Sequence, residues 1–198
     1  MTRYRQPIPG SIGDILPRTY LDHARKVRPV SEPLIQGTVF SAETAAQQAD
    51  LFQSKSPEFY QRFGHPNSRA LARKIAFAEG AEEGLAFASG MAAISTVLMS
   101  FARADARFVV GSQLFDQTST LLDEIAQRCG VRVDRVDMRN PAKLAGALKT
   151  NATLVYIETP SNPHLYLTDI AAITELTTPE GIPVIVDNTF ATPLGQRP

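Results

Sequence analysis

The sequence predicts an α/β fold in which a mainly parallel sheet is covered by helices. Strand-like and helix-like stretches alternate from about Asn67 to the end of the chain, as they do where each strand is followed by a crossover helix. In addition, the strand-like stretches Leu154–Ile157 and Val184–Val186 are apolar throughout, which is typical of strands buried on both faces of a parallel sheet.

The first elements of this fold are two helices and two strands. Each helix carries apolar residues on one face, at the spacing of a buried stripe. The first helix is expected from about Asn67, with Leu71, Ile75 and Ala78 on one face and a stop at Gly80, and a strand is expected over Glu83–Ala88. The second helix begins at Ser89 or Gly90 and carries Ile94, Val97, Leu98 and Phe101 on one face, and a strand over Arg107–Ser112 follows it.

The alternation continues with further helices and strands. Their ends carry residues that favour helix starts and stops, such as proline in the first turn and glycine after the last. A helix with Leu121, Leu122, Ile125 and Cys129 is expected to end at Gly130, and a partly exposed strand over 131–136 follows it. Next come a helix that begins at Asn140 and Pro141 and the strand Leu154–Ile157. A helix capped by Thr168 and Asp169 and ended by Gly181 then leads to a strand over Pro183–Val186.

Length and composition set limits on the domain organisation and on the partners. The 198 residues, 43% of them hydrophobic, amount to one globular domain or slightly more, which excludes disorder as the main state. Residues 1–55 contain scattered proline and glycine with weak periodicity, so we expect an N-terminal arm or wrapping segment there and the α/β domain over 56–198. Twenty basic and twenty acidic residues cancel, so bulk charge favours neither nucleic acid nor a membrane surface as a partner.

Membrane insertion and export are not expected. The uncharged stretch Gly84–Phe101 approaches the length of a spanning helix, but turn residues at 88–90 interrupt it. No apolar signal-peptide core follows the basic residues of the N-terminus, so we expect a cytoplasmic protein. The single cysteine, Cys129, excludes an internal disulfide and a multi-cysteine zinc site, and we interpret it as a core residue of its helix rather than a catalytic thiol.

Two positions at the carboxyl ends of predicted strands favour a ligand site, because ligands of open parallel sheets bind at that edge. Ser89-Gly90-Met91 places a small turn at a helix N-terminus, where free N–H groups and the helix dipole suit a phosphate, although a plain helix cap explains the residues about as well. Asp187 follows an apolar strand, so its carboxylate should emerge partly desolvated at the sheet edge.

Three interpretations of Asp187 are open on spacing alone. It can cap the turn that follows, bind a metal or pair with a protonated heterocyclic nitrogen. The metal is the least favoured, because the three histidines show no ligand spacing and nearby carboxylates such as Glu158 are too few to name an ion. Together with a phosphate seat on the same edge, a heterocyclic partner points to pyridoxal phosphate. Tyr60 and Arg62, two residues apart in a Gly/Pro loop, can converge on a phosphate or lie in solvent.

Four segments together resemble the pyridoxal-phosphate enzymes of cysteine and methionine metabolism, which include cystathionine synthases and lyases, methionine lyase and homoserine-ester sulfhydrylases. The segments are YQRFGHPNSRAL, EGAEEGLAFASGMAAI, ETPSNPHLYLTDI and VDNTFATP, in that order and at family-like spacing. The match runs from about Thr38 to the end of the chain. No dinucleotide-binding or P-loop glycine motif and no nucleophile elbow competes with it. The resemblance implies the large domain of fold-type I pyridoxal-phosphate enzymes.

The resemblance also implies roles for individual residues. Gly90 and Met91 would hold the cofactor phosphate through backbone N–H groups. Asp187 would pair with the pyridine nitrogen, and Asn162 would approach the ring-hydroxyl side. Phe115 stands where the family commonly has a tyrosine followed by Gly-Gly-Thr. Phe115 can stack on the ring but has no hydroxyl, as in some sulfhydrylase-like members, which favours replacement chemistry.

By the same resemblance, Tyr60 and Arg62 would reach the phosphate of a neighbouring subunit's cofactor. This implies a homodimer or a homotetramer.

The resemblance further implies a truncated member of the family. The chain stops at Pro198, before the segment in which the family carries its Schiff-base lysine, and the smaller C-terminal domain with the substrate-carboxylate arginine is also absent. The last residues, ATPLGQRP, predict no helix after the last strand that would cover the sheet. Residues 56–198 are then a partial cofactor-binding domain, and the five lysines present fit none of the family's motifs.

As a whole, the resemblance implies a pyridoxal-phosphate lyase or transferase that acts at the β- or γ-carbon of a sulfur amino acid or a homoserine ester. The 198-residue chain alone is expected to be inactive, because the lysine that such chemistry needs is not in it. The alternatives are a non-catalytic, split or degenerate cofactor-binding module and a dinucleotide-binding domain that lacks its glycine fingerprint.

Overall fold

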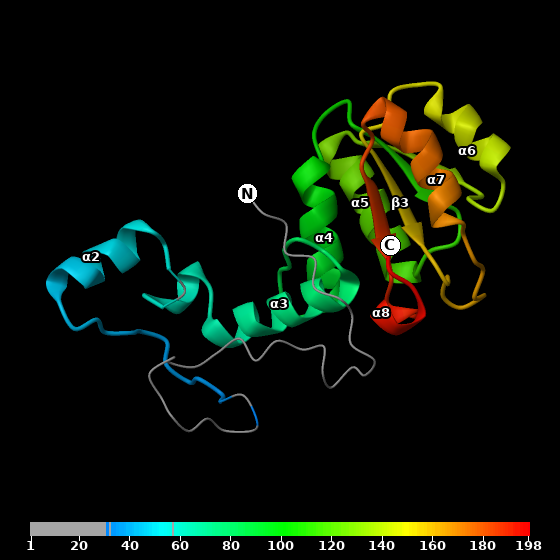
Figure 1. Cartoon of the computed structure of the whole chain (residues 1–198). Coiled ribbons are helices and arrows are strands. Elements are labelled where there is room, and N and C mark those ends of the chain that lie inside the picture. The colour runs from blue at the N-terminus through cyan, green and yellow to red at the C-terminus, as the bar shows by residue number, and fades with distance from the viewer. Residues whose placement is uncertain (1–30, 32, 57) are drawn as a thin grey trace. The chain divides into compact units, whose positions relative to one another are not determined.

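Figure 1 shows the computed structural model of the chain, which describes residues 31, 33–56 and 58–198. The chain divides into two compact units, Met1–Ala86 and Phe87–Pro198, and each is described by itself. Residues 1–30 and 32, a large part of the predicted arm, lie outside the described residues. The expected boundary between the arm and the α/β domain therefore stays a prediction.

The second unit contains a sheet of four parallel strands in the order β2-β1-β3-β4. The strands are β1 (Arg107–Gly111), β2 (Arg132–Val136), β3 (Leu154–Glu158) and β4 (Val184–Asp187). The predicted α/β class with a parallel sheet is confirmed. The chain moves from β1 outward to β2 and then returns to β3 on the other side of β1, so the strand order reverses between β1 and β3. A crevice opens at such a point, outside the carboxyl ends of the strands.

Helices cover both faces of this sheet (Figure 1). They are α4 (Gly90–Phe101), α5 (Asp116–Cys129), α6 (Pro141–Leu148) and α7 (Ile170–Thr177). Helices α4 and α5 pack on one face, and α6 and α7 pack on the other. Successive residues of β1 alternate between the two layers: Phe108 and Val110 pack with α4 and α5, whereas Val109 packs with α6 and α7.

The helix starts predicted in this unit at Ser89, Asn140 and Asp169 are confirmed, because local side chains supply the caps. The helix expected to end at Gly181 ends earlier, at Thr177, and a 3-10 turn leads from there to Gly181. Ser89 Oγ accepts the N–H of Ala92 at 3.1 Å, and Asp169 Oδ1 accepts the N–H of Ala172 at 3.1 Å. Gly130 ends α5 at φ +70°, a left-handed conformation that glycine adopts without steric cost. Strand β2 is partly exposed at the sheet edge, as expected.

The first unit is helical over much of its described part. It contains α2 (Ala45–Gln53), the 3-10 turn η1 (Gln61–Phe63) and α3 (Pro66–Glu79). The helix predicted from Asn67 corresponds to α3 and ends at Gly80, as expected. Helix α2 lies in the segment expected to be an arm. A capping box formed by Thr44 and Gln47 fixes its start, a local signal that the weak apolar periodicity of the segment hides.

Residues 83–88 form no strand, so the strand predicted there is wrong. A strand requires a hydrogen-bonded neighbour, and this segment has none among the described residues. Gly84 instead lies against α3, so close that an added Cβ would meet the Ala72 carbonyl oxygen at 2.5 Å. The buried face of α3 also differs from expectation, because Ala72 is buried whereas Leu71 and Ile75 are about half exposed.

The end of the chain forms a single helical turn, α8 (Thr192–Gly195). The sequence predicts no further helix that covers the sheet, and this single turn buries none of its residues. Asn188 Nδ2 donates to the carbonyl oxygen of Gln196 at 3.0 Å, and Gln196 Nε2 donates to Asn188 Oδ1 at 2.8 Å, so two side chains close the turn. A second 3-10 turn, η2 (Thr178–Glu180), follows α7 and ends at Gly181.

Candidate functional site

A pocket of about 340 Å³ lies at the carboxyl ends of the strands in the second unit. It collects the start of α4, the residue before α5 and the segments that follow β3 and β4. Five of the predicted site residues line it, namely Gly90, Met91, Phe115, Asn162 and Asp187. The remaining lining residues are Ser89, Ile94, Glu158, Pro160, Thr189 and Phe190. The fold thus gathers residues that are far apart in the sequence, and their role toward a cofactor stays a prediction.

The residues at the start of α4 line the pocket. Ser89 caps the helix through its hydroxyl. The N–H groups of Gly90 and Met91 belong to the first turn, which the hydrogen-bond ladder of a helix leaves unpaired. A Cβ at Gly90 would meet no atom within 4 Å, so the space beside this residue is open. The helix-cap and phosphate interpretations are therefore compatible, because different residues serve each.

The carboxylate of Asp187 has partners on both of its oxygens. Oδ1 accepts the N–H of Thr189 at 3.1 Å and its hydroxyl at 2.5 Å, so Asp187 does cap the turn after β4. Oδ2 accepts the hydroxyl of Tyr156 at 3.3 Å. A carboxylate offers about four acceptor positions, so these three bonds leave room for one further donor. Since Asp187 also lines the pocket, capping does not exclude a ligand.

Tyr156 keeps its proton beneath this carboxylate. Its side chain is 1% exposed, and burial raises the pKa of Tyr156 far above its usual range, with the charges of Asp187 and Glu158 raising it further. The hydroxyl therefore acts as a donor to Asp187. Because Tyr156 lies on β3 and Asp187 on the neighbouring β4, two strands together orient the carboxylate.

Glu158 lines the pocket as well, although the sequence pattern indicates it only as a nearby carboxylate. It is 7% exposed. Its Oε2 accepts the N–H of Phe115 at 2.7 Å, and its Oε1 accepts the N–H of Asn162 at 2.6 Å. The pKa of Glu158 lies above its ordinary value. Burial is the main cause and the charge of Asp187 raises the pKa further, whereas the two N–H donors lower it by stabilising the ionised form. Its place as the last residue of an apolar strand, at the edge where ligands bind, is the signal that identifies it.

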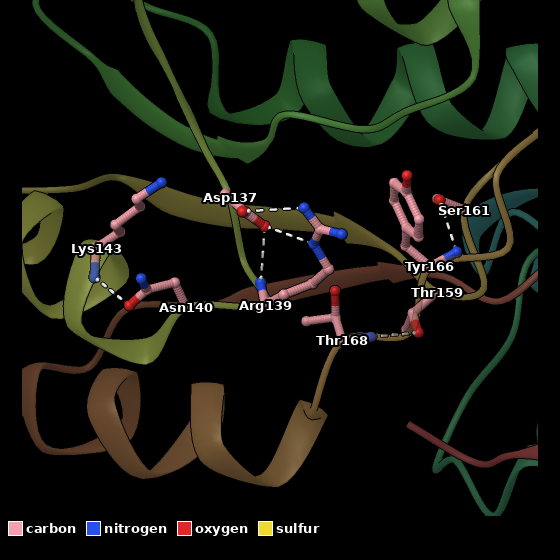
Figure 2. A network of polar contacts seen from close by, with 8 residues as sticks. All are labelled: Asp137, Arg139, Asn140, Lys143, Thr159, Ser161, Tyr166 and Thr168. Atoms are coloured by element: carbon pink, nitrogen blue, oxygen red, sulfur yellow. Dashed lines mark hydrogen bonds and ion pairs between the residues drawn. The ribbon is translucent and has the colours of Figure 1, made fainter.

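Hydrogen bonds and a cation–π contact hold the segment after β3, which carries Asn162, in place (Figure 2). The N–H of Ser161 donates to the Tyr166 carbonyl at 3.1 Å, and the N–H of Tyr166 donates to Ser161 Oγ at 3.2 Å. The guanidinium carbon of Arg139 lies 4.2 Å from the centre of the Tyr166 ring. Arg139 also forms a two-point ion pair with Asp137. The connection between β2 and α6 therefore braces the Asn162 segment.

Tyr60 and Arg62 belong to the first unit, whereas the five pocket residues belong to the second. They contact each other, since the Arg62 guanidinium carbon lies 4.9 Å from the centre of the Tyr60 ring. Tyr60 forms an isolated β-bridge with Val39, and Arg62 is exposed. A phosphate as the shared target of this pair stays a prediction.

Other chemistry-bearing groups lie away from the pocket. None of the four lysines in the described part of the chain lines it. Over residues 31, 33–56 and 58–198, no three His, Cys, Asp or Glu side chains are grouped to hold a metal ion. No helix within that part is long and apolar enough to cross a membrane. Cys129 is partly buried against the core beneath α4 and α5, as its core interpretation predicts.

Known proteins are similar to this chain in sequence. A family described as Cys/Met metabolism PLP-dependent enzyme matches residues 19–198. The chain is 37% identical over 171 residues to an L-methionine gamma-lyase of Porphyromonas gingivalis, which covers 85% of this chain and 43% of that protein. It is 40% identical over 157 residues to a cystathionine beta-lyase of Bacillus subtilis, covering 77% of this chain and 40% of that protein. The chain thus spans less than half the length of these curated relatives.

Solved structures share the fold. A Campylobacter jejuni protein assigned as an O-acetylhomoserine (thiol)-lyase is similar with a TM-score of 0.82 and 26% identity, over 94% of this chain and 45% of that chain. That structure holds an N′-pyridoxyl-lysine-5′-monophosphate.

Proposed function

Because the chain belongs to the Cys/Met metabolism PLP-dependent enzyme family, as its four sequence motifs indicate, we propose that it supplies the cofactor pocket of an enzyme for sulfur amino acids or homoserine esters. Pyridoxal 5′-phosphate (PLP) is the cofactor of this family. The observation that carries the proposal is the pocket at the carboxyl ends of the strands, where five residues of complementary chemistry line one cavity.

The residues present fit this cofactor. The N–H groups of Gly90 and Met91, at the positive end of the α4 dipole, suit the phosphate. Asp187 has an acceptor position left for the ring nitrogen. Phe115 offers an apolar face for the ring, and Asn162 lies in the same pocket to serve the ring-hydroxyl side.

When bound, PLP supplies a ring that accepts electrons from the substrate carbon next to the amino group. The residues of this chain prepare the site for that chemistry. Asp187 keeps the ring nitrogen protonated, since a neighbouring carboxylate favours the positive form, and Tyr156 orients Asp187 by donating its hydroxyl. Phe115 has no hydroxyl, so a proton for a leaving group has to come from another residue.

We propose elimination or replacement at the β- or γ-carbon as the reaction. The names of the methionine gamma-lyase and the cystathionine beta-lyase support a sulfur amino acid as substrate, and the O-acetylhomoserine (thiol)-lyase supports a homoserine ester. Phe115 in place of a phenol favours replacement over elimination. In this proposal, the lysine that anchors the cofactor comes from outside the described residues.

A non-catalytic cofactor-binding module is the second candidate, because no described lysine lines the pocket. Turnover distinguishes the two candidates. The protein to assay carries residues 1–198 followed by the region that completes the relatives. In the catalytic case, it releases an α-keto acid or forms a new thioether from cystathionine, methionine or acylated homoserines. A non-catalytic module does neither, and in both cases the 198-residue chain alone is expected to show no turnover.

The pocket itself is tested with pyridoxamine 5′-phosphate, which carries the ring and the phosphate but forms no bond to a lysine. A fluorescence titration of the 198-residue chain should show saturable binding. Asp187→Asn keeps an acceptor for Thr189 but loses the charge, and it should weaken binding about tenfold or more. The control Asp169→Asn changes a carboxylate that caps α7 outside the pocket, and it should bind like the wild type. Absent binding by the wild type, or equal binding by Asp187→Asn, contradicts the proposed pocket.

A further inference from the structure

We propose that Glu158 is a positioning residue of the pocket, whose buried carboxylate fixes the backbone at Phe115 and at Asn162 relative to each other. It thereby sets the spacing between the side chain that stacks on the cofactor ring and the one that serves the ring-hydroxyl side. The cofactor part of this inference rests on the proposed function, and the positioning part rests on the contacts of Glu158.

The two hydrogen bonds of Glu158 join parts of the chain that no local interaction connects. Phe115 lies 43 residues before Glu158, and Asn162 lies four residues after it. The N···O distances of 2.7 and 2.6 Å are short, as expected for an ionised acceptor. One side chain therefore holds two site residues at once, each by its backbone.

The sheet topology explains why such a link is needed at this place. Phe115 follows β1 and Glu158 ends β3, and these two strands are neighbours. The helices that follow them, α5 and α7, pack on opposite faces of the sheet, so the two connections diverge. The Glu158 carboxylate bridges that divergence, and it fixes the width of the crevice in which the pocket lies.

The two contacts explain why a carboxylate stands at this position. Glu158 is paired in register with Asp187, so two carboxylates lie at adjacent strand ends. Burying a second negative charge there costs stability. A neutral glutamine would avoid this cost, but it has one acceptor oxygen, whereas a carboxylate has two equivalent oxygens, one for each N–H group.

Substitution of Glu158 tests the positioning directly through amide exchange. In Glu158→Ala both partner amides lose their acceptor, so hydrogen exchange at Phe115 and Asn162 should accelerate about tenfold or more. In Glu158→Gln one oxygen remains, so only one of the two amides should accelerate. Protection of Val155, whose N–H donates to the Pro183 carbonyl at 2.9 Å, should persist and shows that the sheet has formed.

Ligand binding then connects this positioning to the pocket. The affinity of the 198-residue chain for pyridoxamine 5′-phosphate should fall about tenfold in Glu158→Ala, and the circular dichroism of the bound ring should change, because ring orientation depends on the stacking side chain. The matched control is Asp123→Ala, the same kind of change at an exposed carboxylate on α5 outside the pocket. It should alter neither the ring signal nor exchange at Phe115 and Asn162.

The outcomes separate this inference from the proposed function. Unchanged hydrogen exchange at both amides in Glu158→Ala overturns the inference. If the wild type binds pyridoxamine 5′-phosphate, unchanged affinity and an unchanged ring signal in Glu158→Ala overturn it as well. Failure of the wild type to bind pyridoxamine 5′-phosphate overturns the proposed function first, and with it the cofactor part of the inference.

Discussion

Gly90 is the residue at which a phosphate seat can be told apart from an ordinary helix start. Capping does not require it, because Ser89 supplies the cap. Backbone conformation does not require it, because its φ is not positive, and packing does not require it, because a Cβ there would meet no atom within 4 Å. Glycine is also a poor helix former. The remaining physical reason for glycine is close approach of a ligand to the backbone.

Gly90→Val should therefore fold normally and bind pyridoxamine 5′-phosphate more weakly. The added side chain enters open space beside the N–H groups, so at least one hydrogen bond to the phosphate is lost, which corresponds to about a tenfold loss of affinity or more. Titration measures the affinity, and thermal unfolding measures the stability of each variant.

Gly146→Val is the matched control for this change. Gly146 also lies in a helix and also has no atom within 4 Å of an added Cβ, but it does not line the pocket. Its affinity should equal that of the wild type. Equal affinity of the Gly90→Val chain would show that no phosphate approaches the start of α4.

Among the elements, β2 is attached to its neighbour β1 by an ion pair in addition to the backbone ladder. Arg107 on β1 is 8% exposed, and its Nη2 lies 2.5 Å from Asp134 Oδ2 on β2. Arg132 also donates to Asp134 at 3.0 Å. Partial burial raises the pKa of Asp134, but the hydrogen bonds and charges of the two arginines lower it by more, so it lies below its ordinary value of 3.8.

Asp134→Asn should lower the free energy of unfolding at neutral pH by about 1 kcal/mol, a value at the low end for a buried arginine because the aspartate is partly exposed. A folded-state pKa below the unfolded one means that the pair stabilises fully above about pH 4 and loses this effect as the pH falls through the folded pKa. Urea unfolding at pH 7 and at pH 3 should show a difference between variant and wild type that shrinks in acid.

Asp123→Asn serves as the comparison, because Asp123 forms an ion pair with Arg135 at the solvent-exposed surface and its side chain is 59% exposed. Its loss of stability at pH 7 should be clearly smaller. If the two aspartate variants lose equal stability, or if the effect of Asp134→Asn persists at pH 3, the ion pair does not hold β2 in the way described.

The elements that could be predicted from the sequence are those decided by local interactions. Ser89, Asn140 and Asp169 cap their helices with side-chain oxygens that accept an N–H two or three residues further along, so a few residues determine each start. The strand expected over 83–88 fails because a strand also depends on a neighbour, which no local pattern specifies. The contact between Glu158 and Phe115 cannot be predicted from the sequence for the same reason, because it depends on β1 and β3 being adjacent.

At the scale of the whole molecule, the predicted site residues fall into two groups. Five line the pocket of the second unit, and Tyr60 and Arg62 lie in the first. The family resemblance implies that these two serve the cofactor of a neighbouring subunit. The competing possibility is that they serve the pocket of their own chain. In a closed dimer with two-fold symmetry the two cases can be distinguished. Each pocket contains residues of both chains in the first case and residues of one chain in the second.

Mixing two defective variants decides between these cases. Arg62→Ala lacks the guanidinium, Asp187→Asn lacks the carboxylate, and each alone should bind pyridoxamine 5′-phosphate weakly in all its pockets. If Arg62 serves the partner, a hybrid dimer has one pocket with both defects and one with neither. Equal mixing gives about half hybrids, so roughly a quarter of all pockets should regain wild-type affinity in a titration. If Arg62 serves its own chain, every pocket keeps one defect and no tight class appears, and sedimentation as a monomer with ligand bound would rule out the shared site altogether.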